Sequence, residues 1–384
     1  MKRLWVLILS LFLLTGGCAL ADDASTQLIL TALNVGKADC LLLESGNSLY
    51  LIDTGTAESW GAVSAFLTER GIEHLTGVII THTDSDHVGG AAALASSSIA
   101  VDDWYTSAFC EKFKDTKNPA LLAAAMRGKN VTFLSEGDML PLDGGMLTVL
   151  GPTEYSDKEN NNSVVLLAEA AGGSMLLTGD MEFPEEALLL ARGLIPACTV
   201  LKVGNHGEND ATSAELVSAV RPKIAVISTN SVEEPDTPAN RVLMLLKNIG
   251  AQIAVTQSAS GGVQVVLQNG EAQISLFDHG AWPSVNDRVI LTDKDNLADV
   301  ISICNTGTEP VDLSGWFIRS ERGGEILVLP RGTILGANRK LTVSTLSSAK
   351  AGEVVWREKN VWHDKKADAA YLCDAYGREV SRLD

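Results

Sequence analysis

The chain has 384 residues, of which 46% are hydrophobic, so it is long enough for two or three domains that each bury a full core. Its formal net charge of −18 excludes a general nucleic-acid-coating protein, because such proteins carry a basic face. It does not exclude an enzyme that handles phosphates through metal ions, since divalent cations reverse the local field.

The N-terminal segment has the features of an export signal. Lys2 and Arg3 precede an apolar run at residues 4–14 that is too short to span a membrane comfortably. "LTGGC" resembles a bacterial lipobox and would make Cys18 the lipidated first residue, whereas "ALA" at residues 19–21 resembles an ordinary signal-peptidase site. A cysteine directly after two glycines favours the lipoprotein. We therefore predict an exported protein anchored by lipid to the extracytoplasmic face of the cell membrane, with a secreted protein as the alternative.

The pattern after the signal alternates short apolar strands with helices, which predicts an α/β domain of layered sheets. Strands are expected at residues 27–35, 39–45, 48–53, 77–81, 164–170, 174–180, 199–204 and 223–229, and helices at 60–71, 184–192, 213–220 and 238–248. The composition divides the chain into a signal at residues 1–21, the α/β domain at 22–277, a linker at 278–288 and an all-β domain at 289–384. Each group of potential ligands follows a strand, as expected for a site at the rim of a sheet.

The stretch "THTDSDHVGG" at residues 81–90 holds four potential metal ligands, His82, Asp84, Asp86 and His87. His82 and Asp84 could hold one cation and the other two a second, because alternate residues of a loop leaving a strand can converge on one point. Two divalent ions about 3.5–4 Å apart polarise a phosphoryl or carbonyl group and supply hydroxide at neutral pH. A solvated turn that caps the next helix is the alternative, but four ligand types in this order favour a metal site.

This loop resembles the H-x-[HD]-x-D-H signature of the metallo-β-lactamase superfamily, in the variant with aspartate as second ligand. "NVGKADCLLLESGNSLYLIDTG" is similar to the opening strands of that family and contains Asp53, which typically supports the histidine loop. "NNNSVVLL", "LLTGDM" and "LKVGNHG" follow in the order found in the extracellular hydrolase-like domain of bacterial competence DNA-uptake (ComEC-type) proteins. The resemblance covers about residues 27–270 and implies an αββα sandwich.

The resemblance also extends the set of metal ligands. It implies that Asp180 of "TGD" bridges the two metals and that His206 of "GNHG" belongs to the site. Asn162 and Ser163 occupy the place where many relatives carry a third histidine, and Asn205 replaces the first histidine of a common "HHG". One ion is therefore expected to be held less tightly than the other.

Supporting or substrate-binding roles are predicted for Asn162, Asp236 and Lys202. Thr237-Pro238 replaces a "HP" of many relatives, and the adjacent Asp236 could substitute for the missing ligand. Lys202 could approach a phosphate oxygen, although an ordinary strand-edge lysine fits the pattern as well. Carboxylate and amide in place of imidazole make the site harder, so manganese rivals zinc as the cofactor.

These features predict an exported dinuclear metal-dependent hydrolase in which Asp86 orients the attacking hydroxide. The resemblance implies a phosphodiester substrate, with DNA outside the cell as one candidate, while the same fold hosts hydrolysis of other ester classes. A non-catalytic surface protein that keeps the fold to bind a ligand is the alternative. Catalysis is favoured because burying so many carboxylates without cations would be costly.

The C-terminal region reads as short strands separated by turn residues, with no helical periodicity. "ICNTGTEPVDLSGWFIRS" and "AYLCDAYGREVSRL" resemble the lamin-tail domain, which implies an immunoglobulin-like β-sandwich with Trp316 in its core. Adhesion, positioning of the enzyme and a purely structural cap are its candidate roles. Cys304 and Cys373 both lie in this region and could pair in an exported domain.

Overall fold

The structure is a computed structural model. It describes residues 27–110, 122, 125–126, 129–280, 284–322, 325–330, 332–345, 348–356, 361–375 and 377–384. The predicted export signal, including Cys18, lies outside the described residues. Within the described ranges, no helix has both the length and the apolar character needed to cross a bilayer.

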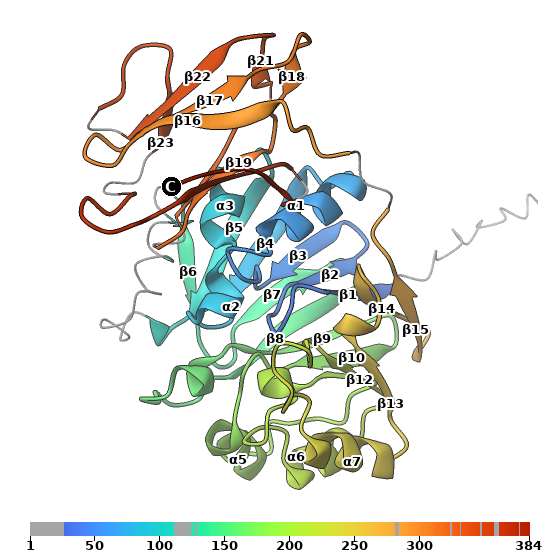
Figure 1. The fold of residues 1–384 in the computed structure, drawn as a ribbon. Helices are drawn as coiled ribbons and strands as arrows, with labels where there is room; N and C mark the ends of the chain where they lie inside the picture. The colour runs from blue at the N-terminus through green and yellow to red at the C-terminus, as the bar shows by residue number, and fades with distance from the viewer. Residues whose placement is uncertain are drawn as a thin grey trace, which may run out of the picture.

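Two mixed sheets face each other in the N-terminal domain (Figure 1). The first sheet has the order β15 (Glu271–Phe277), β14 (Gly262–Gln268), β1 (Leu28–Leu33), β2 (Leu41–Ser45), β3 (Ser48–Ile52), β4 (His74–Ile80), β5 (Ala100–Ser107), β6 (Val131–Leu134). The second has the order β13 (Gln252–Val255), β12 (Ile224–Ile227), β11 (Val200–Lys202), β10 (Gly173–Leu177), β9 (Val165–Ala170), β8 (Gly145–Gly151), β7 (Met139–Leu142).

The apolar strands follow from burial on both faces of each sheet. In β12, Ile224 and Val226 face the core between the sheets, while Ala225 and Ile227 face the helices outside. A strand covered on both sides reads as an unbroken apolar run, which is the pattern of "IAVI". At the edge of the first sheet, β15 instead alternates exposed and half-buried residues.

Helices cover the outer face of each sheet. The first sheet packs against α1 (Trp60–Glu69) and α3 (Ala91–Ser96), and the second against α5 (Phe183–Ala191), α6 (Ala214–Val220) and α7 (Asn240–Asn248) (Figure 1). The four layers form the αββα sandwich that was expected from the sequence. Strands of both sheets end at one rim of this sandwich, where β4, β10 and β11 lead into the predicted metal-binding segments.

The C-terminal domain is an all-β sandwich, as predicted. One sheet has the order β16 (Val289–Asp295), β17 (Val300–Asn305), β22 (Lys340–Thr345), β23 (Val354–Trp356), and the other β20 (Ile326–Val328), β19 (Phe317–Ser320), β24 (Ala370–Cys373), β25 (Glu379–Leu383). A short pair joins β18 (Val311–Asp312) to β21 (Ile334–Leu335). Trp316 lies in the core with Trp356 and Trp362, whose rings meet edge to face with centroids 5.5 Å apart.

The two domains share an apolar interface. Phe317, Ile326 and Val328 of the sandwich belong to the same buried cluster as α1 and α3 of the first domain. At Gly377, a Cβ atom would lie 2.5 Å from Cα of Gly61, so only glycine allows the backbones to approach this closely. The sandwich is therefore packed against the first domain through buried side chains and backbone.

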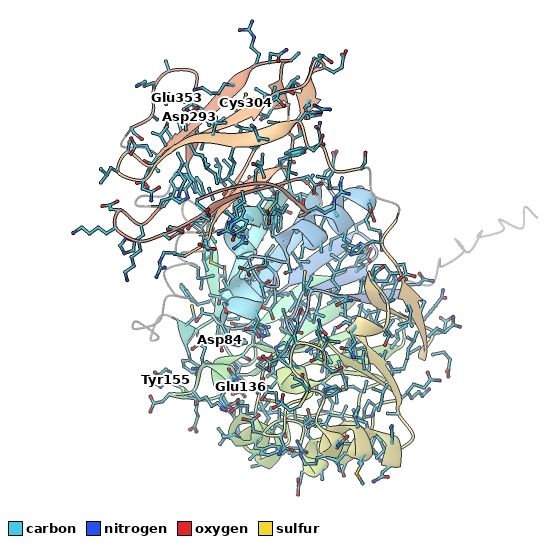
Figure 2. All side chains as sticks on the ribbon, in the orientation of Figure 1. Asp84, Glu136, Tyr155, Asp293, Cys304 and Glu353 are labelled. Carbon is cyan, nitrogen blue, oxygen red and sulfur yellow. The ribbon has the colours of Figure 1, made fainter. Side chains whose placement is uncertain are left out.

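Cys304 and Cys373, which could pair according to the sequence, do not form a disulfide, and both are free. Cys304 lies on β17 of one sheet (Figure 2), whereas Cys373 lies on β24 of the other and joins the interface with the first domain. The two cysteines do not pair because they lie in different sheets of the sandwich.

Candidate metal centre

The histidine loop leaves the end of β4 and enters the short helix α2 (Ser85–Val88). Backbone contacts from neighbouring loops hold it: Asp39 N donates to Asp86 O (3.1 Å), and Thr54 N donates to His87 O (2.7 Å). Gly89 and Gly90 follow the loop, and there is no room for a side chain there: a Cβ at Gly90 would lie 2.5 Å from the Thr54 carbonyl oxygen. The loop is thus held rigidly with its acidic and imidazole side chains directed to one place.

Residues from three separate segments meet in one buried cluster. The ligand atoms of Asp86, His87, Asp180 and His206 all lie within 4.8 Å of one another. Oδ2 of Asp180 is central: it lies 3.2 Å from Nε2 of His87 and 3.3 Å from Nε2 of His206. The structure therefore brings together residues that are more than a hundred positions apart in the chain.

The other two residues of the predicted set border this cluster. Nε2 of His82 lies 3.9 Å from Oδ2 of Asp180 and 3.6 Å from Oδ2 of Asp84. Asp84 is 40% exposed at its side chain and Asp86 28%, whereas the three imidazoles are buried. The cluster consequently opens to solvent on the side of these two carboxylates, and Figure 2 shows Asp84 far from the C-terminal sandwich.

Several buried polar atoms of the cluster have no hydrogen-bond partner. They are Nε2 of His82, His87 and His206, and Oδ1 of Asp180. Buried polar groups are normally paired, and leaving four of them unpaired at one point would be costly. Divalent cations fit this arrangement, since imidazole and carboxylate are ligands for zinc and manganese alike.

Hydrogen bonds on the far side of two rings prepare them as ligands. Nδ1 of His87 donates to Oδ2 of Asp53 (2.8 Å), and Nδ1 of His206 donates to the carbonyl oxygen of Ser228 (2.9 Å). With Nδ1 committed to these acceptors, Nε2 of each ring faces Asp180 and is the nitrogen that would bind a cation in place of its proton. Nδ1 of His82 instead faces hydroxyl groups, those of Thr81 (3.1 Å) and Ser163 (3.3 Å).

The carboxylates and imidazoles shift one another's pKa values strongly. Burial lowers the pKa of His206, but Asp180, Asp86 and Asp39 more than offset it and raise the pKa to about 9. Burial acts in the same direction on His87, yet Asp180, Asp53 and Asp86 raise its pKa well above the ordinary value. Positive charge is therefore favoured at this point, and cations would compete with protons for it.

The carboxylates respond in the opposite sense. Burial raises the pKa of Asp180, but His206 and His87 outweigh it and hold that pKa well below the ordinary value. The pKa of Asp86 is likewise lowered, because His87 and His206 outweigh its burial. The cost of burying these carboxylates, which was expected from the sequence, is thus reduced by the imidazoles of His87 and His206 that the fold places beside them.

Asp53 occupies the supporting position that was expected for it. Its Oδ1 accepts from the Thr81 backbone N–H (2.7 Å), and its Oδ2 accepts from the Thr81 hydroxyl (2.8 Å) as well as from His87. Asp53 is fully buried and has φ of +58°, a conformation that aspartate tolerates better than most residues. The carboxylate therefore connects the start of the histidine loop to its last ligand.

We expect Asp53→Asn to weaken metal binding by about 10- to 100-fold, the usual effect of losing a partner of a ligating histidine. The amide cannot accept all three hydrogen bonds that the carboxylate accepts, so the ring of His87 loses its fixed orientation. Titration of chelator-stripped protein with Mn²⁺ measures this change. Affinity equal to that of the wild type would show that Asp53 does not orient the ring.

Three residues with assigned supporting roles lie elsewhere. The side-chain amide of Asn162 bonds the backbone of Ser156, at 2.9 Å and 2.8 Å, and closes a loop. Asp236 is exposed and belongs neither to the cluster around Asp180 nor to the second group of converging ligand atoms among the described residues, which consists of Asp39, Asp53 and His87. Lys202 is fully buried against Asp39 (2.8 Å), so its ammonium is not open to a substrate as the sequence had suggested.

Asn205 is a structural residue of the His206 segment. Both residues adopt left-handed backbone conformations, with φ of +45° and +52°, within η3 (Gly204–Gly207). Asparagine tolerates this conformation well, and its Nδ2 donates to Glu182 (3.2 Å) and Asp210 (3.2 Å). Asn205 therefore anchors the turn that directs His206 into the cluster.

The sequence did not single out Ser228 or Glu159 as parts of the site. Ser228 acts through its carbonyl oxygen, which any residue could supply, so no side-chain pattern marks it. Oε1 of the buried Glu159 accepts from the backbone N–H of Thr83 (3.0 Å), between the first two predicted ligands. The polar stretch "DKENNNS" is typical of a solvated loop, so the sequence gives no sign that Glu159 is buried. Only the packing of this loop places Glu159 against Thr83.

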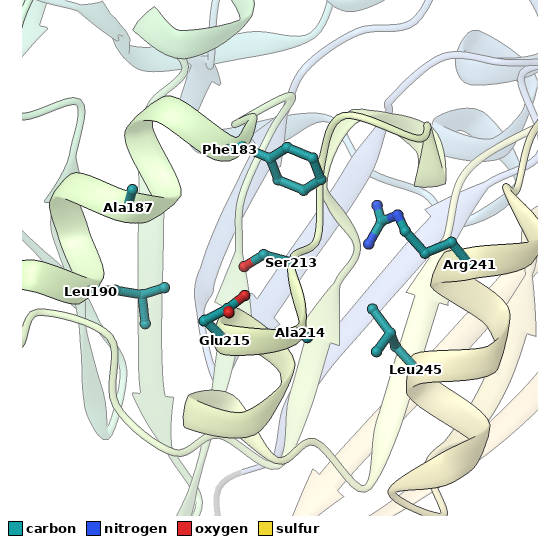
Figure 3. A pocket seen from close by; sticks show the side chains of 8 residues that line it. All are labelled: Phe183, Ala187, Leu190, Ser213, Ala214, Glu215, Arg241 and Leu245. Atoms are coloured by element: carbon teal, nitrogen blue, oxygen red, sulfur yellow. The ribbon is translucent and has the colours of Figure 1, made fainter.

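A separate groove of about 720 Å³ lies among α5, α6 and α7 (Figure 3). It is lined by Phe183, Ala187, Leu190, Ser213, Ala214, Glu215, Arg241 and Leu245. Its guanidinium is already engaged, since Arg241 stacks over the Phe183 ring at 5.1 Å and donates to the Thr212 carbonyl oxygen at 2.8 Å. None of these lining residues belongs to the predicted ligand set.

Two family models match different parts of this chain. Residues 33–231 match the Metallo-beta-lactamase superfamily model, and residues 282–384 match the Lamin Tail Domain model. "ComE operon protein 3" of Bacillus subtilis is 30% identical over 270 residues, which cover 63% of this chain and 34% of that protein. "Recombination protein 2" of Haemophilus influenzae is 29% identical over 242 residues, covering 61% and 28%.

Among solved structures, the metallo-beta-lactamase fold protein YhfI of Bacillus subtilis superposes with a TM-score of 0.43 at 12% identity. The match covers 63% of this chain and 99% of YhfI. The chain spans about a third or less of the length of the two curated relatives that it matches.

Proposed function

The chain belongs to the metallo-beta-lactamase superfamily of metal-dependent hydrolases, and we propose that its reaction is the hydrolysis of a phosphodiester outside the cell. The observation that carries the proposal is the convergence on Oδ2 of Asp180 of three buried imidazole nitrogens, none of which has a hydrogen-bond partner. A group of this composition, open to solvent beside Asp84 and Asp86, is suited to bind divalent ions and a substrate together.

Each predicted ion has its own set of ligands in the proposal. Asp86, His87 and His206 would hold one ion, His82 and Asp84 the other, and Asp180 would contribute to both. Bound divalent ions supply Lewis acidity and lower the pKa of water. Asp86, at the mouth of the site, orients the attacking water by accepting one of its hydrogen bonds.

The two ions should differ in affinity. The set around His206 has four close ligands, whereas the set around His82 has three. The second set has no further imidazole, because Ser163 is a serine whose hydroxyl contacts Nδ1 of His82. Equal numbers of imidazoles and carboxylates suit zinc and manganese alike. The cofactor is therefore proposed to be zinc or manganese, with one tight and one exchangeable position.

DNA is the proposed phosphodiester, on the support of the names of two similar proteins, "Recombination protein 2" and the "Competence protein ComA" of Neisseria gonorrhoeae. The net charge of −18 disfavours broad coating of DNA, so cleavage would depend on the ions to offset charge repulsion at the mouth. The lamin tail domain is proposed to position the hydrolase, since it is fixed to the first domain by the shared core at α1 and α3.

The proposal is tested by metal content and turnover of the same preparation. After purification in dilute chelator, the protein is reloaded with Mn²⁺ or Zn²⁺, its metal content is measured, and it is given bis-para-nitrophenyl phosphate and single-stranded DNA. We expect up to two ions per chain and hydrolysis that stops with excess chelator. Bound metal without turnover of either substrate would favour another ester class, and absence of both metal and turnover would favour a non-catalytic surface protein.

Export through a lipid anchor on Cys18 is part of the proposal, and it rests on the sequence alone. Cys18→Ala is expected to move the protein from the membrane fraction to the medium or to block its maturation. Mass spectrometry of the mature N-terminus of the wild type provides the measurement. A mature protein that begins at Asp22 would show that it is secreted without an anchor.

A further inference from the structure

A fully buried lysine lies beneath the metal centre. Lys202 is the last residue of β11, and its side chain has no exposed surface. Its Nζ lies 2.8 Å from Oδ2 of Asp39 and donates to the carbonyl oxygen of Val203 (3.0 Å). A buried ammonium is costly unless it is paired, so Lys202 and Asp39 depend on each other for their positions.

The pair crosses from one sheet of the sandwich to the other. Asp39 lies in the loop between β1 and β2 of the first sheet, and Lys202 ends a central strand of the second. The same division applies to the metal ligands: the histidine loop follows β4 of the first sheet, whereas Asp180 and His206 follow β10 and β11 of the second. The ligand set is complete only where the two sheets are held in the correct relative position.

Each member of the pair is bonded through its backbone to a ligand segment. Asp39 N donates to the carbonyl oxygen of Asp86 (3.1 Å). The carbonyl oxygen of Lys202 accepts from the hydroxyl of Thr178 (2.8 Å), which begins the turn that carries Asp180. Lys202 also precedes the His206 segment directly along the chain. The side-chain contact therefore links the segments of Asp86, Asp180 and His206.

Asp39 is not itself placed as a metal ligand. Its Oδ1 lies 3.8 Å from Nδ1 of His206, but that nitrogen already donates to Ser228. Asp39 also lies close to Asp53 and His87, but Nδ1 of His87 is engaged by Asp53. The ring nitrogens that Asp39 faces are thus the Nδ1 atoms, which already have acceptors, and not the Nε2 atoms that would bind metal.

We propose that Lys202 and Asp39 are positioning residues, whose buried ion pair holds the two halves of the metal centre at the distance that metal binding requires. The inference rests on the proposed function, because it assumes that the cluster binds divalent ions. It assigns a role to a lysine that neither contacts substrate nor ligates metal.

The sign of one effect separates positioning from simple charge. Lys202→Met removes a positive charge near the cluster, so Coulomb attraction alone predicts tighter cation binding. Loss of the link between the sheets predicts weaker binding instead. In the double variant Lys202→Met with Asp39→Asn, the local net charge is unchanged, and through-space attraction then predicts the affinity of the wild type.

The experiment is a titration of chelator-stripped protein with Mn²⁺, performed on the wild type, Lys202→Met, Asp39→Asn and the double variant. Lys223→Met is the matched control, since Lys223 precedes the adjacent strand β12 and its side chain is 59% exposed beside Glu271. We expect the Mn²⁺ dissociation constant to rise about 10- to 100-fold in Lys202→Met and in the double variant, and to stay unchanged in Lys223→Met.

Unchanged or tighter Mn²⁺ binding by Lys202→Met, or wild-type affinity in the double variant, would overturn the proposal. If the lone buried aspartate prevents Lys202→Met from folding, the double variant decides the question, because its pair is neutral. A merely structural role predicts a lower melting temperature with an unchanged dissociation constant. A wild-type protein that binds no Mn²⁺ or Zn²⁺ would instead contradict the proposed function.

Discussion

Asp180→Asn is expected to remove metal from both positions and to reduce phosphodiester hydrolysis by at least about a thousandfold. Oδ2 of Asp180 lies within 3.2–3.9 Å of Nε2 of His87, His206 and His82. Metal ions contribute several kcal/mol to stabilising charge in such transition states, and each factor of ten in rate corresponds to about 1.4 kcal/mol. Losing the shared carboxylate therefore affects both ions at once.

Metal content and initial rates measured on the same samples test this expectation. Asp102→Asn is the matched control, because Asp102 is 57% exposed and pairs with His74 outside the cluster. The control should keep its metal and its rate. If Asp180→Asn retained two ions per chain, Asp180 would not be the shared ligand, and the assignment of the centre would have to be revised.

Asp86→Asn should have the second largest effect, with loss of one ion and a fall in rate of orders of magnitude. Oδ2 of Asp86 lies 3.3 Å from Nε2 of His206, and the side chain is partly open to solvent. The amide keeps most of the side-chain volume but removes the charge that holds the ion and orients the attacking water. Rates are measured with bis-para-nitrophenyl phosphate and single-stranded DNA in added Mn²⁺ or Zn²⁺. Equal rates from Asp86→Asn and wild type would show that the turnover comes from a contaminant.

The same variant has a defined effect on the metal-free protein. Because the folded-state pKa of Asp86 is lowered, its carboxylate contributes stability that is present above the unfolded pKa of 3.8 and is lost as pH falls below that value. Asp86→Asn should therefore lower the melting temperature of stripped protein at pH 7. Relief of repulsion between carboxylates does not reverse this expectation, because the fold places the imidazoles of His87 and His206 beside Asp86.

Much of the fold could be predicted because the local sequence pattern reflects burial. The strand "IAVI" and the helix that begins at Trp60 are defined by apolar spacing alone. Strands β5 to β8 and β13 to β15 were not predicted, and two of them show local reasons. β5 begins with the exposed run "AVDD", and β7 contains Pro141, which is tolerated there because β7 is an edge strand.

The sequence by itself identified the residues of the histidine loop that are suited to bind metal. The loop after β4 holds four potential ligands within six residues, namely His82, Asp84, Asp86 and His87. Their convergence therefore follows from local geometry. The nature of the centre, a mixed imidazole and carboxylate site at the rim of an α/β sandwich, was therefore readable before any contact was known.

Only the tertiary structure decided how residues distant in the chain meet. Lys202 turned inward to Asp39 instead of outward to a substrate, Asn162 closed a loop, and Asp236 stayed exposed. These outcomes depend on the position of one sheet over the other, which is set by the packing of many apolar side chains between the sheets. A contact between sheets depends on that global packing and not on local spacing, so no short stretch of sequence specifies it.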